Sequence, residues 1–183
     1  MLENLINLVR ENAGDAIINN PAIPNERNEE AVQDASQSVV SSLQNALSSG
    51  NVKDVMKIFS GRTDPSNPVV QDATNNLTQN LSGKYGINGS QASGIAGGLI
   101  PMILSQLAGR TADPSNNGFN IQDIFNQLTG GKTAGVNMGG ILNKFKGGLD
   151  KDGDGDVDLS DLTGLLTGSG GGSVLDKVKG MFN

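Results

Sequence analysis

The chain of 183 residues has no cysteine, no histidine and no tryptophan, and it has a single tyrosine. Without cysteine and histidine, thiol catalysis, Ser-His-Asp catalysis, disulfide frameworks and the usual zinc and haem sites are excluded. Aromatic residues make up only 3% of the chain, so aliphatic side chains must supply most of any core. The longest weakly polar stretch, residues 95–104, contains Pro101 and is about half the roughly 20 residues needed to cross a bilayer. We therefore expect no membrane span.

Negative charge is concentrated in one short segment. The net charge is −6, and residues 150–161 hold six aspartates and one lysine, so the rest of the chain is close to neutral. No basic cluster is present, which argues against nucleic acid as a partner. The acidity therefore belongs to one candidate site.

The N-terminal residues 1–10 are amphipathic, with Glu3 near their start. This pattern differs from a secretory leader, which has a positively charged start followed by an unbroken apolar run. The expected compartment is the cytoplasm, and export by a non-standard route stays open.

The apolar residues recur at helical spacing throughout, which predicts an all-α fold, a multi-helix bundle of short helices with a C-terminal calcium loop. The expected organisation is a helical bundle domain at 1–135, a calcium-binding segment at 136–167, and a Gly-rich linker with a terminal helix at 168–183. The expected apolar helix faces include Val52, Val55, Met56 and Phe59; Ile121, Ile124, Phe125 and Leu128; Met138, Ile141, Leu142 and Phe145; and Val174, Leu175, Val178 and Met181.

Two helix starts have capping signals. Asn28 is expected to cap one helix, with Glu29 and Glu30 in its first turn. Asn67 before Pro68 predicts a second start, since proline suits the first helical position. The helix expected over 90–107 is the most apolar, and its small residues, Ala92, Gly94, Gly97 and Gly98, would allow another helix to approach closely.

Two fragments recur along the chain. Residues 32–36 (VQDAS) recur as 70–74 (VQDAT), and 61–67 (GRTDPSN) recurs as 109–116 (GRTADPSN). The two spacings differ, which excludes a regular solenoid. A duplicated helical hairpin and the repeated use of similar turn and cap chemistry both explain the pattern.

Residues 150–161 (DKDGDGDVDLSD) have the spacing of a calcium-binding loop. Side-chain oxygens at positions one, three and five come from Asp150, Asp152 and Asp154. Asp156 at position seven offers its backbone carbonyl, and Asp158 at position nine acts through water. Gly155 at position six permits the sharp turn, and Val157 anchors the loop to a core. Such oxygens suit a hard cation, and Ca²⁺ is the expected ligand.

This loop resembles the loop of the EF-hand family, and more closely its dockerin-type variant. The metal ligands implied are Asp150, Asp152, Asp154, Asp156, Asp158 and Asp161. Asp161 stands at position twelve, where Glu is standard in EF-hands, so weaker calcium affinity or better tolerance of magnesium is expected. A dockerin has two such loops and this chain has one, which argues against cohesin binding.

The body also resembles, more loosely, the YidB-like family of bacterial helical domains of unknown function. The resemblance covers about residues 1–130 and is carried by residues 1–6 (MLENLI), 84–87 (KYGI) and 92–104 (ASGIAGGLIPMIL). It implies an all-helical fold and a bacterial source, and it supplies no catalytic residue.

Residues 130–133 (GGKT) match only the end of a phosphate-binding loop. The full pattern needs glycine where Asn126 stands and a strand before the loop, whereas the spacing here is helical. A glycine turn at the end of a helix is the favoured interpretation.

Together these features predict a non-catalytic calcium-binding protein, in which the ion orders the C-terminal segment and the body serves as an interaction or assembly module. The alternative is a self-assembling structural protein whose assembly depends on calcium. For this alternative, a location outside the cell stays open. A calcium sensor is less favoured, because Gly147-Gly148 interrupts the helix entering the single loop. An enzyme is not expected, because the loop's own oxygens would fill the shell of the ion.

Overall fold

The computed structural model describes residues 2–113 and 116–146, and all regular structure in these residues is helical. The helices are α1 (Leu2–Asn12), α2 (Asn28–Ser48), α3 (Val52–Phe59), α4 (Pro68–Tyr85), α5 (Gly89–Ala112), α6 (Ile121–Leu128) and α7 (Met138–Lys146). A π-helical turn at Gly14–Ile18 and 3₁₀ turns at Asn25–Arg27 and Asn117–Phe119 lie between them. The expected all-α bundle is thus confirmed for the described residues. The calcium loop and the terminal helix of the prediction lie outside them.

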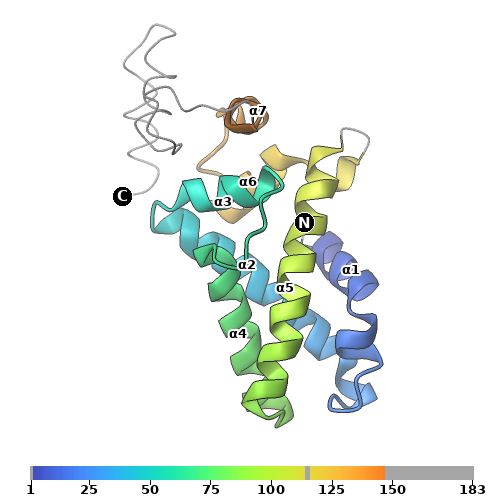
Figure 1. The fold of residues 1–183 in the computed structure, drawn as a ribbon. Helices are drawn as coiled ribbons and strands as arrows, with labels where there is room; N and C mark the ends of the chain where they lie inside the picture. Colours follow the sequence, from blue (N-terminus) through green and yellow to red (C-terminus); the bar gives the residue numbers. More distant parts are fainter. Residues whose placement is uncertain (1, 114–115, 147–183) are drawn as a thin grey trace, which may run out of the picture.

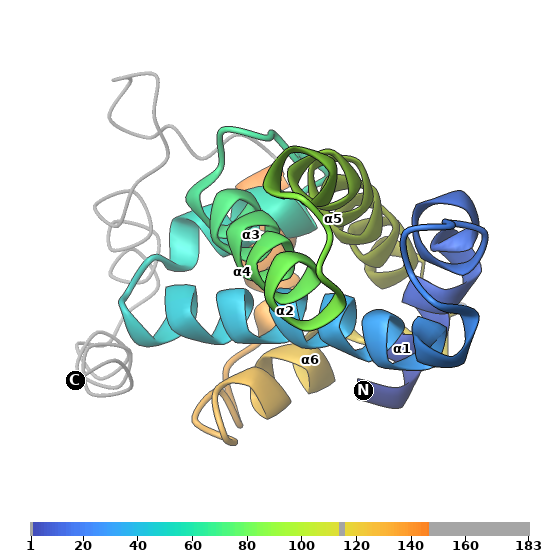
Figure 2. The ribbon, with the colours of Figure 1, turned by 90° about the horizontal axis from the view of Figure 1, so that it is seen from below.

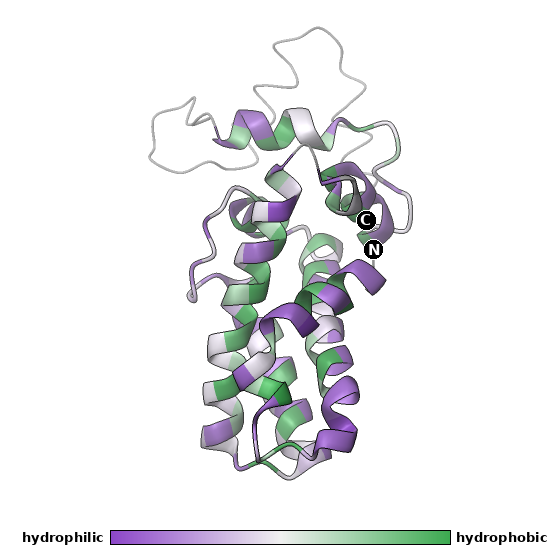
Figure 3. Ribbon diagram, turned by 90° about the vertical axis from the view of Figure 1, so that its right-hand side faces the viewer, coloured by the Kyte–Doolittle hydropathy of each residue, from purple (hydrophilic) through white to green (hydrophobic). Residues whose placement is uncertain are grey.

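Helix α5 lies at the centre of the arrangement, between α4 on one side and α1 on the other (Figure 1). Seen from below, α2 runs across the view and α4 lies in front of it (Figure 2). Apolar residues from the successive helices are buried together in one core. Along each helix, hydrophobic and hydrophilic residues alternate (Figure 3). Helices α6 and α7 pack together at the end of the molecule where α5 ends, and α7 also contacts α3.

The core is aliphatic, as the low aromatic content requires. Phe59 and Phe125 are its largest fully buried side chains, and their ring centroids lie 5.6 Å apart. Met138, Leu142 and Phe145 of α7 belong to the same cluster as the core of the preceding helices. The expected division at residue 135 stays a prediction.

Small residues let α2 and α4 pack closely. Ser38 and Ser42 of α2 are almost fully buried, and the Asn76 amide of α4 donates a hydrogen bond to Ser42 Oγ over 3.2 Å. Ser36 Oγ donates to the carbonyl of Val32, four residues earlier in the same helix. The hydroxyl of Ser36 is thereby satisfied within its own helix.

The repeated fragments VQDAS and VQDAT occupy equivalent positions in α2 and α4. Val32 and Ala35 in α2, like Val70 and Ala73 in α4, are fully buried. Thr74 Oγ1 donates to the carbonyl of Val70, as the hydroxyl of the corresponding Ser36 does in α2. The two segments therefore share a buried face and a hydroxyl contact. This likeness is consistent with a duplicated helical hairpin and also with the repeated use of similar local chemistry.

The capping predictions have mixed outcomes. The Asn67 side chain accepts a hydrogen bond from the Val69 amide over 2.9 Å, with Pro68 at the first helical position, which confirms this cap. The prediction for Asn28 is wrong: Arg27 is at the cap position, without a side-chain cap hydrogen bond. Asn28 is already helical because the preceding 3₁₀ turn leads directly into α2, and its amide donates to the carbonyl of Ile18.

The glycines of α5 do not serve the packing predicted for them. Ala92 and Ala96 face the core, whereas Gly94, Gly97 and Gly98 are exposed, and a Cβ on any of these three would meet no atom within 4 Å. The helical period explains the difference, because it turns these three positions away from the buried stripe. The expected close approach of another helix at these glycines is thus absent within the described residues.

Candidate functional site

The predicted calcium ligands cannot be placed from the structure. All six aspartates, Asp150, Asp152, Asp154, Asp156, Asp158 and Asp161, lie outside the described residues. Within residues 2–113 and 116–146, no group of three or more acidic, histidine or cysteine side chains is arranged to hold a metal ion. The calcium site remains a prediction from the sequence.

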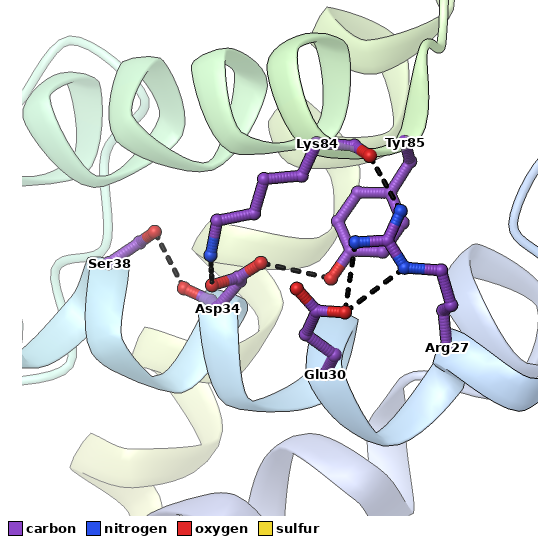
Figure 4. Close-up of polar contacts among 6 residues, drawn as sticks. All are labelled: Arg27, Glu30, Asp34, Ser38, Lys84 and Tyr85. Atoms are coloured by element: carbon purple, nitrogen blue, oxygen red, sulfur yellow. Dashed lines mark hydrogen bonds and ion pairs between the residues drawn. The ribbon is translucent and has the colours of Figure 1, made fainter.

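A polar cluster in the described residues joins α2 to the end of α4 (Figure 4). The Asp34 side chain is only 12% exposed, and its Oδ1 lies 2.5 Å from the ammonium nitrogen of Lys84. The Tyr85 hydroxyl donates a hydrogen bond to Asp34 Oδ2 over 2.9 Å. Ser38 Oγ donates to the backbone carbonyl of Asp34 over 2.7 Å. Both carboxylate oxygens of Asp34 are therefore engaged by α4.

Arg27 extends the cluster at the start of α2. Its guanidinium carbon lies 4.3 Å from the centroid of the Tyr85 ring, close enough for a cation–π interaction. Its Nη1 donates to the carbonyl of Lys84 over 2.6 Å, and its Nε and Nη2 donate to Glu30 Oε2. The Lys84 carbonyl lies in the last turn of α4, where carbonyls lack helical donors. Arg27 thus satisfies a helix end that would otherwise need water.

The electrostatics of the cluster keep the phenol neutral. Burial raises the pKa of Tyr85, and the hydrogen bond to Asp34 and the negative charge of that carboxylate raise it further. A protonated tyrosine that donates to a carboxylate with both oxygens engaged leaves no free base or nucleophile between them. The arrangement is suited to holding two helices together.

Sequence reasoning missed this cluster. Its available signal is the spacing of Asp34, Ser38 and Ser42, which places polar residues on one buried face of α2. The partners come from about 50 residues further along the chain, and only the packing of α4 on α2 brings them together.

Tyr85 gives this cluster a testable dependence on pH. The folded chain binds the phenolic proton more tightly than the unfolded chain, so the stabilisation is complete below the ordinary tyrosine pKa of about 10 and is lost as pH rises through the raised folded value. We expect the free energy of unfolding to fall more steeply above about pH 10 in the native chain than in Tyr85→Phe. Denaturant unfolding across this range measures the difference.

The single tyrosine permits a direct check on the same titration. The chain has one tyrosine and no tryptophan, so tyrosinate absorbance reports Tyr85 alone. Titration of the folded chain at the ordinary tyrosine value, or identical pH profiles for the native chain and Tyr85→Phe, would contradict the prediction.

The residues GGKT form a turn after α6 and not a phosphate loop. Gly130 and Gly131 have positive φ angles of 62° and 87°, directly after α6 ends at Leu128. Thr133 is buried, and its hydroxyl donates to Asn126 Oδ1 over 2.7 Å. The interpretation as a glycine turn at a helix end is confirmed.

Helix α5 qualifies the expectation of no membrane span. Gly89–Ala112 is long and apolar enough to cross a bilayer by length and composition, and 44% of its most apolar window is buried inside the protein. A core helix passes the same test, so this is weak evidence for a span. The absence of a span stays an expectation.

No known protein family, curated protein or solved structure was found to match this chain. The EF-hand, dockerin-type and YidB-like resemblances therefore rest on the sequence motifs alone.

Proposed function

We propose that this protein is a non-catalytic calcium-binding helical protein, in which the ion orders the C-terminal segment and the helical body serves as an interaction or assembly module. The observation that carries the proposal is the register of residues 150–161, where aspartates occupy positions one, three, five, seven, nine and twelve of a calcium loop. Glycine at position six and valine at position eight fit the same register.

The ligand set favours calcium over other metals. Carboxylate and carbonyl oxygens suit Ca²⁺, which takes six to eight oxygen ligands, and the chain has no cysteine or histidine for a softer metal. The loop carries a charge of −5 without an ion, so the carboxylates repel one another until a cation neutralises them. Asp161 is one methylene shorter than the usual glutamate, which favours modest affinity.

The body supports a role in binding over one in catalysis. Its best-formed polar cluster has Asp34 engaged through both oxygens and Tyr85 held neutral, so these groups support the packing of α2 on α4. The ion pairs Arg10–Glu29 and Arg110–Glu11 likewise join α1 to α2 and to α5. These contacts make a fixed helical platform, which precedes the proposed metal loop in the chain.

Calorimetry on the full chain tests the proposal. We expect one calcium site with a dissociation constant on the order of micromolar, within the range of EF-hand sensors, and weaker binding of magnesium. Asp150→Ala removes the ligand at position one and should abolish the signal. Asp123→Ala, which removes an exposed aspartate of α6, serves as the matched control and should bind as the native chain does. No heat of binding up to millimolar calcium would overturn the proposal.

A further inference from the structure

A groove lies between α4 and the exposed side of α5. It has a volume of about 330 Å³ and is lined by Pro65, Val70, Gln71, Thr74, Asn75, Gly97 and Pro101. Pro101 has no amide proton, so the carbonyl of Gly97 loses its usual helical donor. The groove therefore combines apolar contact area with an available backbone acceptor and the side-chain amides of Gln71 and Asn75.

The exposed face of α5 continues beyond this groove. Gly94 and Gly98 follow one side of the helix, and Met102 next to them is 39% exposed. Met102 and Ile18 are the large apolar side chains that stand out as exposed in the described part of the chain. Glycine inside a helix costs about 1 kcal/mol relative to alanine. No atom of the described residues requires glycine at either position, so this shallow face is not explained by the packing of the body.

The chain itself contains an apolar segment that needs such a surface. Residues 173–183 lie outside the described residues, and Val174, Leu175, Val178, Met181 and Phe182 recur there at helical spacing. Helices of this length gain most of their stability from packing an apolar face against a partner. A helix formed by this segment would expose that face unless another surface covered it.

The length of chain beyond α7 brings this segment within reach of α5. Twenty-seven residues separate the end of α7 from residue 174, and a flexible chain of that length, as expected before calcium orders residues 150–161, would span about 30 Å. Helix α5 has 24 residues and is therefore about 36 Å long. Helix α7 lies at the end of the molecule where α5 ends (Figure 1). The span of the connecting chain is therefore comparable with the length of α5 along which the segment would lie.

We propose that residues 173–183 dock on their own chain as an amphipathic helix, along the exposed face of α5 and into the groove that α5 forms with α4. The absence of side chains at Gly94, Gly97 and Gly98 lets a helix approach closely, and Met102 supplies apolar contact at the edge. A tether of this length gives the segment an effective concentration on the order of millimolar, which favours it over a second copy at ordinary protein concentrations. The inference does not depend on calcium binding.

The cysteine-free sequence allows a direct test by thiol labelling. Met102→Cys and, separately, Asn75→Cys each place a single thiol on the proposed docking surface of the full chain. We expect each thiol to react with a maleimide at least about tenfold faster when Leu175→Asp and Val178→Asp are added, because these charges release the segment. Ile18→Cys is the matched control, since Ile18 is equally exposed but lies in a separate hollow with Asn19 and Asn28. Its rate should not change.

Two labelling positions are used so that the test does not depend on one variant. Circular dichroism identifies a cysteine variant that fails to fold, and the labelling rate at the other position then tests the proposal. Equal rates with and without the two aspartates would overturn the proposal. Protection that grows with protein concentration would also overturn it, because it would assign the surface to a second copy.

Discussion

Replacing Asp34 with alanine is expected to destabilise the fold by about 2–3 kcal/mol, the range for loss of a buried carboxylate that accepts hydrogen bonds from two side chains. The substitution removes the acceptor of the Tyr85 hydroxyl and the counter-ion of Lys84 together. Lys84 is 45% exposed and can return to water, which holds the effect below that of a fully buried pair. Urea denaturation followed by far-ultraviolet circular dichroism measures the change.

Asp72 provides the matched control for this prediction. It occupies the position equivalent to Asp34 in the repeated fragment on α4, and it is half-buried. Because it lies outside the cluster that joins the two helices, Asp72→Ala should change the free energy of unfolding by no more than about 0.5 kcal/mol. Equal losses in the two variants would show that the cluster contributes nothing beyond an ordinary aspartate.

Local rules account for most of what the sequence predicted about the fold. The apolar spacing of Val52, Val55, Met56 and Phe59 defines α3, and these residues are buried or half-buried in the structure. Asn67 before Pro68 places the start of α4 because the cap and the proline act on adjacent residues. Periodicity, however, does not say which neighbour each face meets. Gly97 and Gly98 are exposed because α4 and α1 pack against other sides of α5, and the sequence alone does not show which sides these are.

The two sites also differ in whether the sequence could predict them. Residues 150–161 could be recognised from the sequence because consecutive positions of one loop supply all of the ligands. The Asp34 cluster could not, because its contacts with Lys84 and Tyr85 join residues 50 and 51 positions apart. The capping error at Asn28 has a similar cause, since its amide bonds to Ile18 across a turn whose path the sequence pattern does not specify.

Calcium is expected to protect the C-terminal segment from proteolysis by about 100-fold when free calcium is a hundred times its dissociation constant. At that concentration the ion stabilises the bound form by about 2.7 kcal/mol, and only about one chain in a hundred is free of the ion. Lys151 at position two of the loop gives trypsin a site inside the metal-binding segment. Cleavage after Lys151, followed by mass spectrometry of the released peptides that begin at residue 152, measures the protection.

The control must separate the loop from the protease, because an ion added to the mixture acts on both. Asp154→Ala removes a side-chain ligand and leaves Lys151 in place, so this variant should be cleaved at the same rate in calcium and in chelator. Cleavage after Lys57 in α3 tests whether the effect is local, since this site belongs to the described body and should respond little to the ion. Equal cleavage at Lys151 with and without calcium in the native chain would contradict the proposal that the ion orders the C-terminal segment. It would leave the docking of residues 173–183 on α5 to be decided by thiol labelling alone, because that contact requires no metal.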